Sequence, residues 1–142
     1  MQRSMILVCH AADGSFNDGN RSAIRGLLEQ AAYIRQVDPL GRARVRITCT
    51  DGADLELYAP GLDGKRPFHR MEICLTNLTP TKDQLQLVLD LMRSGGFGLM
   101  ENLNASKFIV TLPQQVVYFP WLPEPPMLVR NTRDLGHTIS HL

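Results

Sequence analysis

The stretch FHRMEICLTNLTPTKDQLQLVLDLMRSGG, residues 68 to 96, predicts a strand that leads directly into a helix, and the rest of the chain can be arranged around it. In its first part Met71, Ile73 and Leu75 alternate with polar residues and Cys74. This period of two is typical of a strand with one buried face. We therefore expect a sheet that is covered by helices on one side.

The helix in this stretch has clear start and stop signals. Thr79 can accept a hydrogen bond from a free N–H of the first turn, and Pro80 fits the first helical position because an N–H there has no helical partner. Gly95 and Gly96 tolerate the left-handed conformation that ends many helices. The sequence thus predicts a helix between Pro80 and Gly95.

This helix carries apolar side chains on two sides. Its core-facing stripe consists of Leu85, Val88, Leu89 and Met92. Leu87 and Leu91 lie on roughly the opposite side. Burying a leucine stabilises a protein by roughly 1.5 to 3 kcal/mol, so we expect something to cover this second side. The cover is either the C-terminal segment of the same chain, or a second subunit or another protein.

The other segments predict an α+β domain. They are a central strand over residues 5 to 10, a helix over 20 to 37, a hairpin over 42 to 50 and 54 to 58, and strands over 97 to 100 and 107 to 112. This order fits a ferredoxin-like split βαβ sandwich, a mostly antiparallel sheet with two helices on one face, plus extra strands. We expect one domain over residues 1 to 119, and a proline-rich extended arm and tail over 120 to 142 that packs on the domain or on a partner subunit.

Composition narrows the class of protein. A net charge of +1 over 142 residues gives no general attraction to nucleic acid or to anionic membranes. No apolar run is long enough for a membrane span or a signal-peptide core, so we expect a soluble cytoplasmic protein. Cys9, Cys49 and Cys74 lie in apolar segments without a CxxC pair, which predicts buried free thiols.

The loop after the first strand is a candidate anion site. Its glycines resemble a phosphate-binding loop, but Asn20 and Arg21 stand where that motif requires Lys and then Ser or Thr. Free N–H groups at the start of the following helix could still hold an anion. The residues expected around such a ligand are His10, Asn20, Arg21, Arg25 and His69.

Two further groups of residues each allow two interpretations. Arg42, Arg44 and Arg46 lie on the outer face of the predicted hairpin, where they can pair with Asp54 and Glu56 or form a phosphate-binding strip for nucleic acid. His137 and His141 have the spacing of two metal ligands on one helix face, but no third ligand is evident. We expect a solvated tail there and no metal site.

The segment from residue 116 to residue 127 is dense in aromatic residues and prolines. Four prolines forbid a regular helix, and large apolar side chains in an extended chain must lie against something. The arm therefore wraps its own domain or contacts a partner. The predicted interface residues are Leu87, Leu91, Tyr118, Phe119, Trp121, Leu122 and Met127.

The sequence therefore predicts a small binding or interaction protein, a homodimer or the receptor of a protein partner, rather than an enzyme. The first alternative is a small enzyme or ligand-binding domain whose anion-accepting pocket lies near His10, Arg21, Arg25 and His69. Nucleic-acid binding through Arg42, Arg44 and Arg46 is a further alternative. No motif indicates a cofactor.

Overall fold

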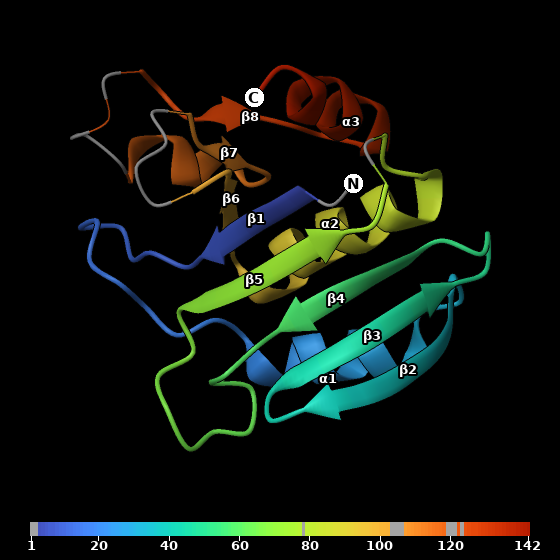
Figure 1. Cartoon of the computed structure of the whole chain (residues 1–142). Helices are drawn as coiled ribbons and strands as arrows, with labels where there is room; N and C mark the ends of the chain where they lie inside the picture. Colours follow the sequence, from blue (N-terminus) through green and yellow to red (C-terminus); the bar gives the residue numbers. More distant parts are fainter. Residues whose placement is uncertain (1–2, 78, 103–106, 119–121, 123) are drawn as a thin grey trace.

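A computed structural model describes residues 3–77, 79–102, 107–118, 122 and 124–142. In this part of the chain eight strands form one sheet (Figure 1). In spatial order they are β2 (Ile34–Gly41), β3 (Arg44–Cys49), β4 (Asp54–Tyr58), β5 (Arg70–Leu75), β1 (Arg3–Val8), β6 (Gly98–Met100), β7 (Ile109–Val110) and β8 (Met127–Leu128). Neighbouring strands are antiparallel except β7 and β8, which are parallel. The predicted α+β class and mostly antiparallel sheet are confirmed.

The helices gather on one side of this sheet. They are α1 (Arg21–Gln30), α2 (Lys82–Gly95) and α3 (Thr132–Ser140), and a short 3-10 helix, η1, spans Pro113–Val117. Figure 1 shows α1 and α2 behind the strands, and α2 contacts both α1 and α3. Among the described elements, no helix covers the opposite face of β3, β4 and β5 (Figure 1).

The alternation of the strands decides which side chains form the core. Met71, Ile73 and Leu75 of β5 are buried, as predicted, and so are Leu55 and Leu57 of β4. The predicted hairpin is β3 and β4, in which Arg46 lies opposite Glu56 and Thr48 opposite Asp54. These pairs place the charged residues of both strands on the face away from the helices.

The start of α2 differs from the prediction by two residues. Thr81, not Thr79, caps the helix, because its side chain accepts the Gln84 N–H at 3.2 Å while the Gln84 side chain accepts the Thr81 N–H at 2.9 Å. This reciprocal pair satisfies two backbone donors at once. The C-terminal signal is confirmed, since Gly96 adopts the left-handed conformation with φ of 81°.

The chain itself covers both sides of α2. Leu87 and Leu91 are fully buried, in the same cluster as Leu135 and Ile139 of α3. Gly136 brings α3 close to α2, because a Cβ at this position would lie 3.0 Å from a methyl group of Leu85. Of the two covers that the sequence left open, the structure shows the C-terminal segment of the same chain as part of the cover, and Leu87 and Leu91 are not exposed to a partner.

Two segments differ in secondary structure from the prediction. The helix predicted over residues 20 to 37 ends at Gln30, and the second part of that range enters β2. Pro39 is compatible with β2 because β2 is an edge strand, where a missing N–H breaks no pairing. The tail after residue 126 is extended only in its first part, where β8 joins the sheet. From Thr132 it forms α3, which Asn131 caps by accepting the Asp134 N–H at 2.8 Å.

Because α2 is covered on both sides, truncating one of its buried leucines should lower the free energy of unfolding substantially. Leu91→Ala leaves a cavity in a fully buried site, so we expect the free energy of unfolding to fall by about 2 to 5 kcal/mol. Leu40→Ala is the matched control, because Leu40 is 40% exposed on the edge strand and its loss is expected within about 0.5 kcal/mol. Chemical denaturation followed by circular dichroism measures both. Equal losses for the two variants would contradict burial of Leu91 within one chain.

Candidate functional site

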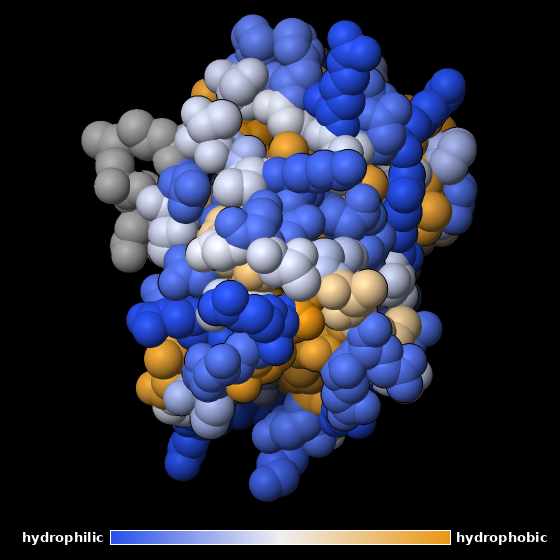
Figure 2. Space-filling model, turned by 90° about the vertical axis from the view of Figure 1, so that its right-hand side faces the viewer, coloured by the Kyte–Doolittle hydropathy of each residue, from blue (hydrophilic) through white to orange (hydrophobic). Residues whose placement is uncertain are grey.

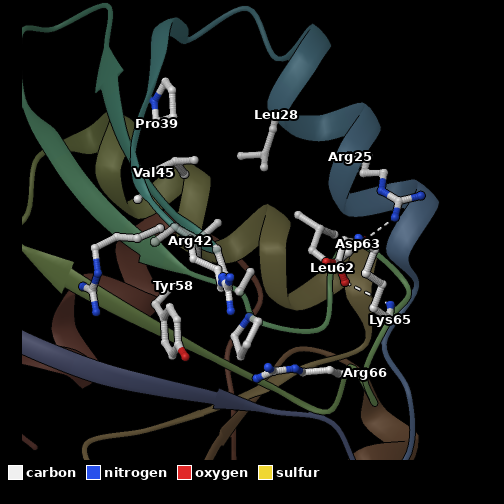
Figure 3. Close-up of a pocket in the computed structure, with 16 residues that line it drawn as sticks. Arg25, Leu28, Pro39, Arg42, Val45, Tyr58, Leu62, Asp63, Lys65 and Arg66 are labelled. Carbon is white, nitrogen blue, oxygen red and sulfur yellow. Dashed lines mark hydrogen bonds between the residues drawn. The ribbon is translucent and has the colours of Figure 1, made fainter.

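A basic pocket lies where α1, the β2–β3 hairpin and the loop after β4 meet. Its volume is about 860 Å³, within the usual range for small-molecule sites of roughly 300 to 1,000 Å³. Figure 3 shows the sixteen described residues that line it. Its cationic residues are Arg25, Arg42, Arg44, Lys65 and Arg66, and its apolar residues are Leu28, Pro39, Ala43, Val45, Leu57, Ala59, Pro60 and Leu62. Gly41, Tyr58 and Asp63 complete it.

The β2–β3 hairpin places two of the arginines. Its turn contains Ala43 with φ of 61°, a left-handed conformation that is unfavourable for a residue with a Cβ. The Ala43 carbonyl accepts the Ala59 N–H at 2.9 Å, which ties the turn to the end of β4. Such a conformation persists where the surrounding structure enforces it. The tie fixes the backbone between Arg42 and Arg44 at the pocket wall.

Side chains from α1 hold the loop that forms the opposite wall. The Arg21 guanidinium donates to the Gly61 carbonyl at 2.8 Å and to the Arg66 carbonyl at 2.7 Å, and Arg25 donates to the Leu62 carbonyl. The neck of the loop is tight, because a Cβ at Gly61 would lie 2.3 Å from the Pro67 carbonyl oxygen. The loop that carries Lys65 and Arg66 is thus held in one place by two arginines.

Asp18 adds a third contact to this loop. Its carboxylate accepts the Phe68 N–H at 2.9 Å and pairs with Arg21 at 3.2 Å. The Phe68 N–H, followed by the charge of Arg21, holds the pKa of Asp18 below its usual value. The carboxylate beside the start of α1 therefore supports the loop.

Several cations of the pocket are not neutralised by the described part of the chain. The side chains of Arg42, Lys65 and Arg66 form no hydrogen bond or ion pair with described residues. Figure 3 shows Arg42 and Arg66 extending toward the same space near Tyr58, whereas Asp63 lies close to Arg25 and Lys65. Asp63 is the one carboxylate among the lining residues. Uncompensated positive charge is therefore concentrated at the end that Tyr58 occupies.

An aromatic ring borders this end of the pocket. The Arg44 guanidinium lies over the Tyr58 ring, 5.1 Å from its centroid. A cation is attracted to the face of an aromatic ring, so the contact restrains Arg44 without using its N–H groups. Arginine N–H groups bind phosphate and carboxylate oxygens in pairs. The arrangement can accept an anionic group next to a flat ring.

The structure brings together residues that the sequence placed in two different sites. Arg25 was expected in an anion site at the start of α1, and Arg42 and Arg44 in a nucleic-acid strip, but all three line one pocket. Arg46 lies outside it, on the open sheet face, and pairs with Asp54 at 3.9 Å. The sequence analysis missed Lys65 and Arg66. The sequence feature that could have identified them is a Lys-Arg pair in a glycine-rich and proline-rich loop, about twenty residues from the hairpin arginines.

The other residues of the expected anion site lie elsewhere. Asn20 caps α1, because its side chain accepts the Ala23 N–H at 3.1 Å, and Arg21 holds the loop. His10 and His69 both contact the Phe16 ring, with centroid distances of 5.3 and 4.6 Å. Burial, followed by the nearby His69, lowers the pKa of His10. Neither histidine lines the basic pocket.

The described part of the predicted arm packs on its own chain. Tyr118 and Leu122 contact a small cluster around Phe108 and Val110, and Met127 of β8 packs against the main core. Phe119 and Trp121 lie outside the described residues. The arm contacts observed here are therefore contacts within one chain.

Exposed apolar side chains do not add an argument for an interface. Among the described residues, the large exposed ones are Phe16, Leu40 and Val117, on three separate segments. The side of the molecule shown in Figure 2 is mostly hydrophilic, with hydrophobic atoms visible between polar side chains in its lower half. Single apolar side chains are common on protein surfaces. Self-association and capture of a protein partner stay predictions.

The cysteines and histidines form no metal centre within the described residues. No group of three or more His, Cys, Asp or Glu side chains in that part of the chain could hold a metal ion. All three cysteines are free; Cys9 and Cys49 are buried, whereas Cys74 is half-buried. Burial raises the pKa of both buried thiols to about 11. In the described structure no helix is long and apolar enough to cross a membrane.

Comparison with known proteins gives no relative from which a function can be transferred. No model of a protein family, no curated protein and no solved structure matches this chain. The site must therefore be interpreted from its own geometry.

The contacts of Arg21 predict how the pocket wall responds to its removal. Arg21→Ala eliminates two charge-assisted hydrogen bonds to the loop, so we expect amide hydrogen exchange of residues 61 to 67 to become faster. Arg35→Ala is the control, because Arg35 is an exposed arginine on the edge strand. Exchange measured by mass spectrometry separates the two. Unchanged exchange in the loop of Arg21→Ala would show that Arg21 does not hold it.

The lowered pKa of Asp18 predicts a pH-dependent contribution to stability. A depressed pKa in the folded state stabilises the protein above the unfolded pKa, and this contribution is lost as the pH falls through the folded pKa. We expect the wild type to be more stable than Asp18→Asn at neutral pH, with a difference that shrinks below the ordinary value of 3.8. Denaturation curves across this pH range test this, with Glu29→Gln as an exposed control. A difference that does not vary with pH would exclude the ionised carboxylate as its cause.

Proposed function

We propose that this protein binds a small anionic ligand, with a phosphate or carboxylate group, in the basic pocket. The observation that carries the proposal is that Arg42 and Arg66 extend toward the space near Tyr58, over whose ring the Arg44 guanidinium lies. Asp63 is the one carboxylate among the lining residues. Like charges repel, so holding several cations together destabilises the unliganded pocket. An anion that binds between them relieves this repulsion.

The rest of the lining supports a ligand with an apolar part. Leu28, Val45 and Leu62 come from three different elements and give the pocket an apolar surface behind its charged rim. Ligand sites typically combine such a surface with a few polar groups that fix orientation. The ligand class that fits is therefore a metabolite with an anionic group and an apolar or aromatic body.

The lining favours binding over catalysis. Among the sixteen described residues that line the pocket there is no His, Cys, Ser or Glu. Histidine is the most frequent acid–base catalyst, and serine and cysteine are common nucleophiles, whereas this lining offers Asp63, Lys65 and Tyr58. A binding module, which recognises the ligand without changing it, is the function that these residues support best.

A ferredoxin-like core is part of the proposal. It consists of β1, α1, β4, β5, α2 and β6, with β2 and β3 inserted before β4. What supports it is the order β4-β5-β1-β6, in which β1 lies between β5 and β6, the two strands that α2 connects. The inserted hairpin then supplies one wall of the pocket. Fold alone does not establish function, which rests on the pocket.

Anion binding can be measured by isothermal titration calorimetry with inorganic pyrophosphate as the probe. Arg42→Ala and Arg66→Ala each remove a charged donor, and a charged hydrogen bond contributes about 1.5 to 3 kcal/mol, so we expect affinity to fall by about tenfold to a hundredfold. Affinity should also fall with rising salt concentration, because salt screens exposed charges.

Arg133→Ala is the matched control for these variants. Arg133 is an exposed arginine of α3 and does not line the pocket, so its removal should leave the affinity unchanged. If pyrophosphate does not bind the wild type, or if all three variants bind it equally, the basic pocket is not an anion site.

A further inference from the structure

A second cavity adjoins the basic pocket on the open face of the sheet. Its volume is about 340 Å³, and it is lined by Tyr58, Pro60, Arg70, Met71 and Glu72. Tyr58 and Pro60 also line the basic pocket, so the two cavities meet at these residues. A ligand in the basic pocket that extends past Tyr58 would therefore reach the second cavity.

The pairing of the strands aligns the two cavities. Tyr58 of β4 lies directly opposite Arg44 of β3 and directly opposite Glu72 of β5. Directly opposite residues point to the same face of a sheet, and neighbouring strands are about 4.8 Å apart. Arg44 and Glu72 therefore mark the ends of a row about 10 Å long across two strand spacings, with Tyr58 at its centre.

The two ends of this row differ in charge. At one end the Arg44 guanidinium is not paired with any carboxylate of the described residues, and Arg42 lies in the same turn. At the other end Arg70 donates to Glu72 at 2.9 Å, and both side chains are about two-fifths exposed. This internal pair is neutral overall but still presents N–H donors and a carboxylate oxygen. It suits a polar, uncharged group rather than a second anion.

The middle of the row is the aromatic ring of Tyr58, and the Arg44 guanidinium lies over one face of this ring. The Tyr58 ring and Pro60 form the boundary that any ligand spanning both cavities must cross. Aromatic side chains are the usual stacking partners of nucleobases, because every base has a π-face. Carboxylates are common partners of ribose hydroxyl groups. Nucleoside phosphates combine a phosphate group, a flat ring and polar hydroxyl or amino groups in one molecule.

We propose that the ligand is a nucleoside phosphate. Its phosphate group lies among Arg42, Arg44 and Arg66, its nucleoside crosses Tyr58, and its polar edge reaches the Arg70–Glu72 pair. This inference rests on the proposed function, because it assigns a ligand class to the same basic pocket. It adds the second cavity, with Glu72 as the residue that recognises the part of the ligand without phosphate.

Calorimetry with a graded set of probes tests this on the full chain. The probes are pyrophosphate, ribose 5-phosphate, AMP, ADP and adenosine. We expect ADP to bind about tenfold more tightly than pyrophosphate, and AMP about tenfold more tightly than ribose 5-phosphate, because stacking of a base on an aromatic ring adds to the phosphate contacts. Adenosine, which lacks the phosphate group, should bind more weakly than AMP.

Two conservative variants separate the second cavity from the first. Glu72→Gln keeps the shape of the side chain but removes its charge, so we expect weaker binding of ADP and unchanged binding of pyrophosphate. Glu56→Gln is the matched control, because Glu56 lies on the same sheet face in β4 but lines neither cavity. It should change neither affinity. Circular dichroism verifies that both variants fold.

The outcomes distinguish this inference from the proposed function. Equal binding of ADP and pyrophosphate, with no effect of Glu72→Gln, would overturn the nucleoside phosphate and leave the anion pocket standing. Ribose 5-phosphate binding as tightly as AMP would overturn the role of the base. Affinity that keeps rising from a mononucleotide to a hexanucleotide would overturn a free nucleotide in favour of single-stranded nucleic acid. Binding of none of the anionic probes would overturn both proposals.

Discussion

Burial of α2 is the constraint on which the rest of the structure depends. A helix with apolar side chains on opposite sides is stable only if it is covered on both. The sheet covers one side of α2. The helices α1 and α3 lie beside α2, on the same face of the sheet. Leu87 and Leu91 are fully buried in this arrangement. The need to cover α2 therefore draws the C-terminal segment back onto the domain.

Placing the helices on one side leaves the other face of the sheet for polar chemistry. Most outward residues of β3, β4 and β5 are charged, and cross-strand pairs such as Arg46 and Asp54 compensate part of the charge. The basic pocket forms at the rim, where the β2–β3 hairpin and the loop after β4 approach α1. The second cavity lies further along the open face, beside Arg70 and Glu72.

Arginine has two separate roles around this pocket. Arg21 and Arg25 donate to backbone carbonyls of the loop, so their charge helps to fix the wall. Arg42 and Arg66 make no such contacts with described residues, and their guanidinium groups are available to a ligand. The first pair is therefore structural as well as electrostatic. The rigid wall fixes the backbone that carries the second pair, which lowers the backbone entropy lost on binding.

Local pattern determined much of the secondary structure and the α+β class. Alternation predicted β3, β4 and β5, and Gly95 with Gly96 marked the end of α2, because backbone geometry sets the period of strands and the conformation of a cap. β2 was not predicted. Residues 34 to 37 suit a helix as well as a strand, and their pairing with β3 decides for the strand. Arg25, Arg42 and Arg44 were also among the candidate binding residues predicted from the sequence.

Tertiary structure alone decided which of these residues share a site. Arg25, Arg42 and Arg66 come from three elements separated by roughly twenty residues each, and no local pattern encodes their convergence. The sequence by itself determined the strands, the helices and the supply of arginines, because these depend on residues close together in the chain. The pocket, the second cavity and the cover over α2 depend on strand order and helix packing, which bring distant residues together.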